Sequence, residues 1–150
     1  MTKDVLISIS GIHMVEGDES GEDVELITTG TYYVKNGTRY LLYDEVMEGL
    51  DQPVKNVVKI REDSLEIIKR GGVNVHMTFR RGMTVMSSYV TPFGELMVGI
   101  TTEKLRKEET EDRLNLRVDY LLDLNGQQVS RCHIVLGVSS RGEKNPEENK

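Results

Sequence analysis

VNVHMTFRRGMTVMSSYVTPFGELMVGITT, residues 73–102, contains three strand-like segments separated by two short turns at residues 80–82 and 91–94. In the second turn, Pro92 presets the φ angle for the first central position of a type I turn. Gly94 suits the left-handed position that completes a three-residue hairpin loop with a bulge. The residues of this second turn are therefore explained by backbone geometry and need no catalytic role.

The first turn predicts a register for the two strands on either side of it. A three-residue loop at 80–82 that ends in a left-handed Gly82 pairs Phe79 with Met83. The same register pairs Met77 with Val85, Val75 with Ser87 and Val73 with Tyr89. A slip by one residue would mix apolar and polar side chains, which a half-buried sheet resists. The predicted interior face therefore carries Val73, Val75, Met77, Phe79, Val85 and Tyr89.

The Gly71-Gly72 turn, just before this stretch, leaves two registers open. A two-residue loop turns Arg70 inward together with Ile68. A three-residue loop turns Leu65 and Ile67 inward instead. The second places more apolar surface inside the sheet and is favoured.

The same pattern of short strands and tight turns continues in both directions. Val5, Ile7 and Ile9 alternate on one face, and Asn-Gly pairs at 36–37 and 125–126 supply the positive φ angles of hairpin turns. A sequential antiparallel sheet of this length leaves two exposed edges unless it closes. The prediction is an all-β, lipocalin-like antiparallel up-and-down barrel of about 8–10 strands. It forms one domain at residues 1–140, followed by a disordered charged tail at 141–150.

Composition excludes several classes of protein. The 150 residues carry a net charge of −6, which argues against binding to nucleic acid or to an anionic membrane surface. Cys132 is the single cysteine, so the chain forms no internal disulfide. No apolar run is long enough for a signal peptide or a membrane-spanning helix. A reduced, cytoplasmic protein is expected.

Short motifs occur in an order that is similar to one known family. They are Gly30-Thr31-Tyr32, Tyr43-Asp44-Glu45, Arg70-Gly71-Gly72, Met77-Thr78-Phe79, the segment from Tyr89 to Gly94, and Tyr120. Over residues 4–138 the chain resembles the YwiB-like family of uncharacterised bacterial proteins, which are lipocalin-like, or calycin-like, β-barrels. The resemblance implies a small antiparallel barrel and no activity. Secreted lipocalins carry a Gly-x-Trp motif and this chain has no Trp, so retinoid or haem carriage is not implied.

Catalytic and metal-binding patterns are missing from the sequence. The histidines are His13, His76 and His133, and no pair has the spacing of a zinc site. Cys132 and His133 are adjacent in a strand and point to opposite faces, so they do not chelate one ion together. Neither a Gly-x-Ser-x-Gly motif nor a phosphate-binding loop is present. The sequence therefore predicts no metal and no cofactor, and it does not favour an enzyme.

Two classes of function remain. In the first, the barrel binds a small apolar molecule through Met77, Phe79, Val85, Tyr89 and Tyr120, with Glu45 and Arg70 at the mouth. The tyrosines and phenylalanines serve equally well as core filling, which is favoured. A structural ion pair, or two exposed charges, is likewise the simpler explanation of Glu45 and Arg70. In the second class, the barrel is packed solid and acts as a protein interaction or oligomerisation module, for example as a homodimer. Its contacts are strand edges near the N-terminus, or the loop at 46–53 with Met47 and Leu50.

Overall fold

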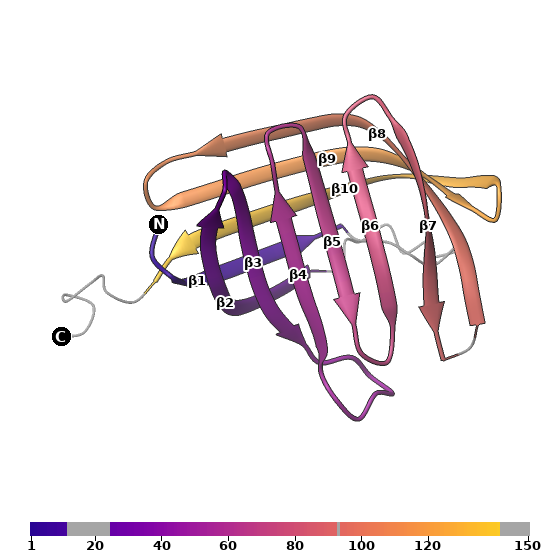
Figure 1. Ribbon diagram of the computed structural model, residues 1–150, viewed down its shortest axis with the longest axis horizontal. Helices are drawn as coiled ribbons and strands as arrows, with labels where there is room; N and C mark the ends of the chain where they lie inside the picture. Colours follow the sequence, from indigo (N-terminus) through magenta and orange to yellow (C-terminus); the bar gives the residue numbers. More distant parts are fainter. Residues whose placement is uncertain (12–24, 93, 142–150) are drawn as a thin grey trace.

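The computed structural model describes residues 1–11, 25–92 and 94–141, and all the regular elements in them are β-strands. The strands are β1 (Asp4–Ser10), β2 (Glu25–Lys35), β3 (Thr38–Glu45), β4 (Val54–Ile60), β5 (Ser64–Arg70), β6 (Asn74–Arg80), β7 (Thr84–Thr91), β8 (Gly94–Glu109), β9 (Arg113–Leu124) and β10 (Gln127–Ser140). Each strand pairs with its sequence neighbours, and β1 pairs with β10 to close the barrel (Figure 1). The predicted antiparallel up-and-down barrel is confirmed.

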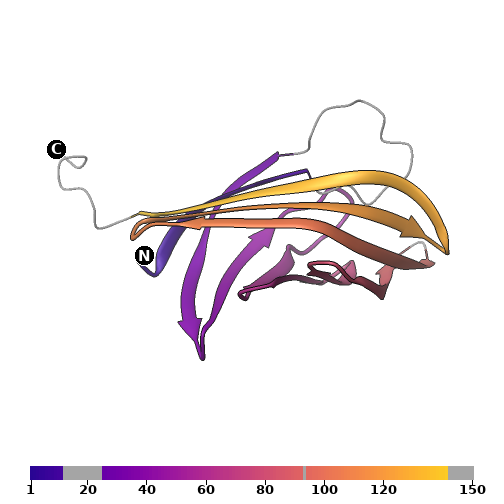
Figure 2. The same cartoon turned by 90° about the horizontal axis from the view of Figure 1, so that it is seen from above.

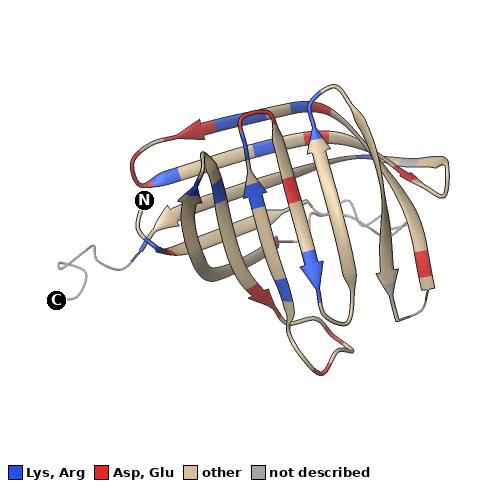
Figure 3. Ribbon diagram, in the orientation of Figure 1, with Lys and Arg blue, Asp and Glu red and all other residues tan. Residues whose placement is uncertain are grey.

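The barrel has walls of unequal length. The long strands β8, β9 and β10 run side by side along one wall, and the shorter strands β3 to β6 lie across from them (Figure 2). Charged residues are spread over many strands and turns (Figure 3). Residues 142–150, most of the expected tail, lie outside the described residues, as do His13 and Phe93.

Inward-facing apolar residues alternate with outward-facing residues along the strands, and the inward-facing ones form the core. Val5, Ile7 and Ile9 are buried as expected, and their neighbours on β1 are more exposed. At the centre, Phe79 and Tyr120 are both fully buried and meet edge to face, with ring centroids 5.0 Å apart. This edge-to-face geometry is a preferred one for aromatic pairs. The buried Cys132 belongs to the same apolar cluster.

The β6–β7 register differs by two residues from the prediction. Val75 pairs with Tyr89 rather than with Ser87. Gly82 has the expected positive φ of 77°. The turn, however, is hydrogen-bonded to β8, because the Gly82 amide donates to the Thr102 carbonyl at 2.9 Å. Met83 accepts a hydrogen bond from the Thr102 amide at 3.2 Å. A shift of two residues keeps every side chain on its predicted face.

Three other predicted connections can be compared with the structure. The Gly71-Gly72 turn is the favoured three-residue loop, since Lys69 pairs with Val75 and Leu65 and Ile67 are fully buried. Thr91 pairs with Gly94, so two residues separate the paired positions rather than three as expected. The two Asn-Gly turns have the positive φ angles that were predicted: 51° at Asn36, 79° at Gly37, 52° at Asn125 and 86° at Gly126.

Candidate functional site

A row of inward-facing side chains crosses the barrel wall from β3 to β8 near one end. Its members are successive ladder partners, and we call them the mouth row: Tyr43, Asn56, Lys69, Val75, Tyr89 and Leu96. The next inward positions on β3 to β6 form a parallel row below it: Leu41, Val58, Ile67 and Met77. All four of these are buried. The mouth row therefore sets polar groups directly above an apolar floor.

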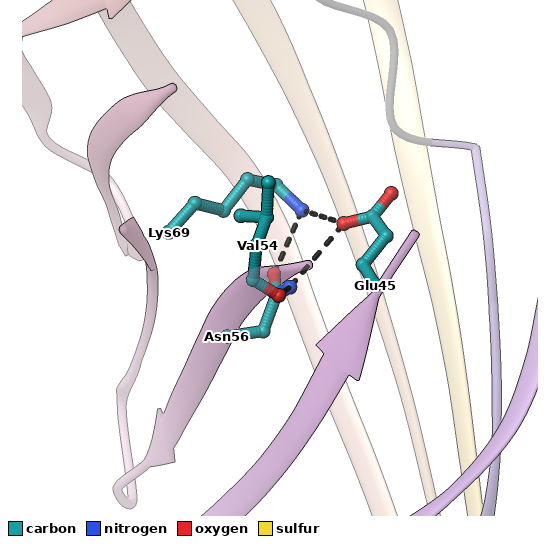
Figure 4. A network of polar contacts seen from close by, with 4 residues as sticks. All are labelled: Glu45, Val54, Asn56 and Lys69. Atoms are coloured by element: carbon teal, nitrogen blue, oxygen red, sulfur yellow. Dashed lines mark hydrogen bonds and ion pairs between the residues drawn. The ribbon is translucent and has the colours of Figure 1, made fainter. Parts of the chain in front are cut away.

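Three polar side chains near the mouth row form one network (Figure 4). The Lys69 Nζ donates to Glu45 Oε1 and to Asn56 Oδ1, both at 2.8 Å. The Asn56 Nδ2 donates to Glu45 Oε1 and to the Val54 carbonyl, both at 3.3 Å. Lys69 and Asn56 are buried, whereas the Glu45 side chain is 22% exposed. The network gives hydrogen-bond partners to the Asn56 amide and the Lys69 ammonium, and it has no net charge.

The charge of Glu45 acts on two tyrosines of the mouth row. The Tyr43 hydroxyl is buried and has no hydrogen-bond partner among the described residues. Burial, and after it the charge of Glu45, raises the pKa of Tyr43 above its ordinary value. The same two causes raise the pKa of Tyr89. Both hydroxyls are therefore protonated at neutral pH and can donate hydrogen bonds.

Two clefts in the barrel wall reach the mouth row. The larger has a volume of about 640 Å³ and is lined by Thr28, Thr29, Gly30, Thr31, Leu42, Tyr43, Asp44, Lys55, Asn56 and Val57. It lies where β2 leaves β3, because their ladder extends only as far as the pair of Thr31 with Leu42. The smaller cleft, of about 250 Å³, lies across β5, β6 and β7 and includes Lys69 and Val75. Two mouth-row residues thus line each cleft, together with outward-facing residues such as Lys55 and Arg70.

The structure separates the residues that the sequence suggested for ligand contact. Glu45 and Tyr89 lie at the mouth, Met77 lies in the floor, and Phe79 and Tyr120 are buried in the core. Val85 is half-buried on β7. Arg70 is exposed, and Lys69 takes the place beside Glu45 that was considered for Arg70. Whether any of these residues contacts a ligand stays a prediction.

Sequence reasoning missed Tyr43, Asn56 and Lys69 as members of the site. A signal was present for Lys69, because it alternates with Leu65 and Ile67 and so shares their inward face. Asn56 lies in the same way between Val54 and Val58. A polar residue within an inward-facing apolar series marks a place where the barrel interior is polar.

Residues 1–11, 25–92 and 94–141 contain no group of three or more His, Cys, Asp or Glu side chains that could hold a metal ion. In the same residues, no helix is long and apolar enough to cross a membrane.

Replacing Lys69 with methionine is expected to lower the free energy of unfolding by about 2 kcal/mol, because Asn56 and Glu45 lose a charge-assisted donor in a mostly buried place. The matched control is Arg70→Met, on the exposed face of the same strand, with an expected change within about 0.5 kcal/mol. Urea unfolding followed by circular dichroism measures both. Equal losses in the two variants would contradict the inward assignment of Lys69.

The chain can be compared with known proteins. A family described as "Domain of unknown function (DUF1934)" matches residues 7–136. The chain is 28% identical over 128 residues to the uncharacterized beta-barrel protein YwiB of Bacillus subtilis strain 168, which covers 85% of this chain and 89% of that protein. The crystal structure of the ywiB protein from Bacillus subtilis has a TM-score of 0.74 at 24% identity, over 93% of this chain and 92% of that one. The resemblance to a YwiB-like barrel is confirmed, and the structural likeness concerns the fold alone.

Proposed function

The chain belongs to the family described as a domain of unknown function (DUF1934), and we propose that its barrel binds a small, mostly apolar molecule at the mouth row without transforming it. One observation carries the proposal: a polar row, reached by two clefts, lies above a buried apolar floor. Small-molecule sites combine an apolar lining with a few placed polar groups. A cytoplasmic location belongs to the same proposal.

The proposal gives the suggested residues different tasks. Met77 forms the surface on which the apolar part of the molecule rests, and Tyr89 and Glu45 flank it. Phe79 and Tyr120 support this floor from below, because they are buried against each other. Arg70 is exposed and has no task inside the barrel in this proposal.

Met77→Trp is expected to abolish binding of N-phenyl-1-naphthylamine, a neutral apolar fluorescent probe, because the larger indole raises the floor into the site. The natural chain has no Trp, so the introduced indole also reports directly on the environment of the floor. The matched control is Met86→Trp, at an exposed position of β7. Fluorescence titration measures affinity, and circular dichroism verifies that both variants remain folded. An unchanged affinity in folded Met77→Trp protein would disprove the proposed site.

Native mass spectrometry of the protein as purified from cells tests for a resident molecule. We expect a mass excess over the chain that disappears when the same sample is denatured. A clean chain mass, together with no binding of the naphthylamine probe, would overturn the proposal.

The second candidate function is a protein interaction or oligomerisation module, and it is favoured by exposed methionines. Met83, Met86 and Met97 are each about half exposed on or beside β7 and β8. Flexible thioether side chains are common at adaptable binding surfaces. The contacts expected from the sequence are less suitable, because β1 is paired on both sides and Leu50 packs against Gly72. Light scattering that shows only a monomer would count against a homodimer.

A further inference from the structure

We infer that the mouth row selects an apolar molecule that ends in a neutral hydroxyl group, rather than in a carboxylate or an amine. The inference rests on the proposed function and adds the chemistry of the ligand's polar end. It follows from two features of the site: its charge balance and the hydrogen-bonding groups that its residues leave unused.

The charge balance disfavours an ionised ligand. Lys69 and Glu45 form an ion pair at 2.8 Å, and Asn56 occupies further hydrogen-bonding positions of both. A ligand carboxylate would have to compete with Glu45 for the Lys69 ammonium. A ligand ammonium would have to compete with Lys69 for the carboxylate. Either ion would also add an unbalanced charge to a partly desolvated site, which is unfavourable.

The inference uses one donor and one acceptor that have no partner within the network. The Tyr43 hydroxyl is buried and has no hydrogen-bond partner among the described residues. Tyr43 is one of the residues that line the larger cleft. Glu45 accepts both of its hydrogen bonds within the network on Oε1. Figure 4 shows the other carboxylate oxygen pointing away from Lys69 and Asn56.

A hydroxyl group complements this pair of groups. It has one donor and two acceptor lone pairs, so it can accept from the Tyr43 hydroxyl and donate to Glu45. An ionised carboxylate only accepts, and an ammonium only donates. A buried hydroxyl without a hydrogen-bond partner costs free energy of desolvation. A ligand that supplies the missing partner removes that cost on binding.

The test is a displacement series on the full chain at neutral pH. Three ligands of equal chain length compete with N-phenyl-1-naphthylamine: 1-decanol, decanoic acid and decylamine. We expect 1-decanol to bind at least about tenfold more tightly than the two ionised ligands. Equal or tighter binding of decanoate or decylammonium would overturn the inference.

Charge-changing variants of the network make the test sharper. Lys69→Met leaves the Glu45 carboxylate without its counter-ion and should shift the preference toward decylammonium. Glu45→Gln leaves the Lys69 ammonium unbalanced and should shift the preference toward decanoate. An unchanged order of affinities in both folded variants would show that the ligand's head group lies elsewhere.

The Tyr43→Phe variant tests the contribution of the Tyr43 hydroxyl to binding. We expect this variant to bind 1-decanol about five- to tenfold more weakly, which corresponds to the loss of one hydrogen bond. Its thermal midpoint should not fall, because no hydrogen bond within the chain is lost. Unchanged decanol affinity would remove Tyr43 from the inference.

Failure of all three ligands and of the probe to bind would overturn the proposed function itself. Binding of the three ligands without selectivity would overturn only this inference.

Discussion

Replacing Phe79 with alanine is expected to lower the free energy of unfolding by about 3–5 kcal/mol. Phe79 is fully buried and packs edge to face on Tyr120 at 5.0 Å. The loss therefore combines the removed apolar surface, the cavity that remains, and an aromatic contact of about 0.5–1.5 kcal/mol. Urea unfolding followed by far-ultraviolet circular dichroism gives the value.

The control for this substitution lies on the same strand and points outward. His76→Ala removes a side chain that is 53% exposed and contacts Glu66 at 3.4 Å. Exposed pairs of this kind contribute less than about 1 kcal/mol. A loss below about 1 kcal/mol for Phe79→Ala would mean that the interior around this ring is not close-packed.

Gly30→Ala is expected to lower the free energy of unfolding by about 3 kcal/mol, although it adds only a methyl group. A Cβ atom at this position would lie 2.5 Å from the carbonyl oxygen of Leu42 and 2.7 Å from Cδ1 of Ile7. The first neighbour is backbone of β3, so relief requires the two strands to move apart. This close approach gives the Gly-x-Tyr motif at 30–32 a physical reason.

Gly99→Ala is the matched control, since Gly99 is also a glycine within a strand. Its nearest obstacle would be Met86 Sδ at 2.8 Å. The Met86 side chain is half exposed and flexible, so it can rotate away. We expect a loss of less than about 1 kcal/mol. Thermal and urea unfolding of both variants measure the difference, and similar losses would refute the strand-contact explanation for Gly30.

Local patterns in the sequence were sufficient for the architecture. Alternation placed Val5, Ile7 and Ile9 on one face, and each Asn-Gly pair specified a tight turn, because both depend only on neighbouring residues. The favoured loop at Gly71-Gly72 was confirmed for the same reason. Hairpins in sequence order then leave closure as the way to remove both sheet edges.

Register across several strands was harder to predict. The β6–β7 pairing differs by two residues from the prediction, because the turn at 80–83 hydrogen-bonds to β8, which is distant in the sequence. Each side chain keeps its predicted face despite this difference, because the pleat repeats every two residues. The predicted cross-strand partners were wrong.

The candidate site depends on tertiary structure for this reason. Tyr43, Asn56 and Lys69 come from three strands and meet only because two successive registers bring them into one row. Turn chemistry specifies each hairpin separately, whereas a row across many strands requires every register along it to be correct at once. The amino-acid order therefore fixes which faces are apolar and where the chain turns, and the registers between successive strands select which polar side chains meet at the mouth.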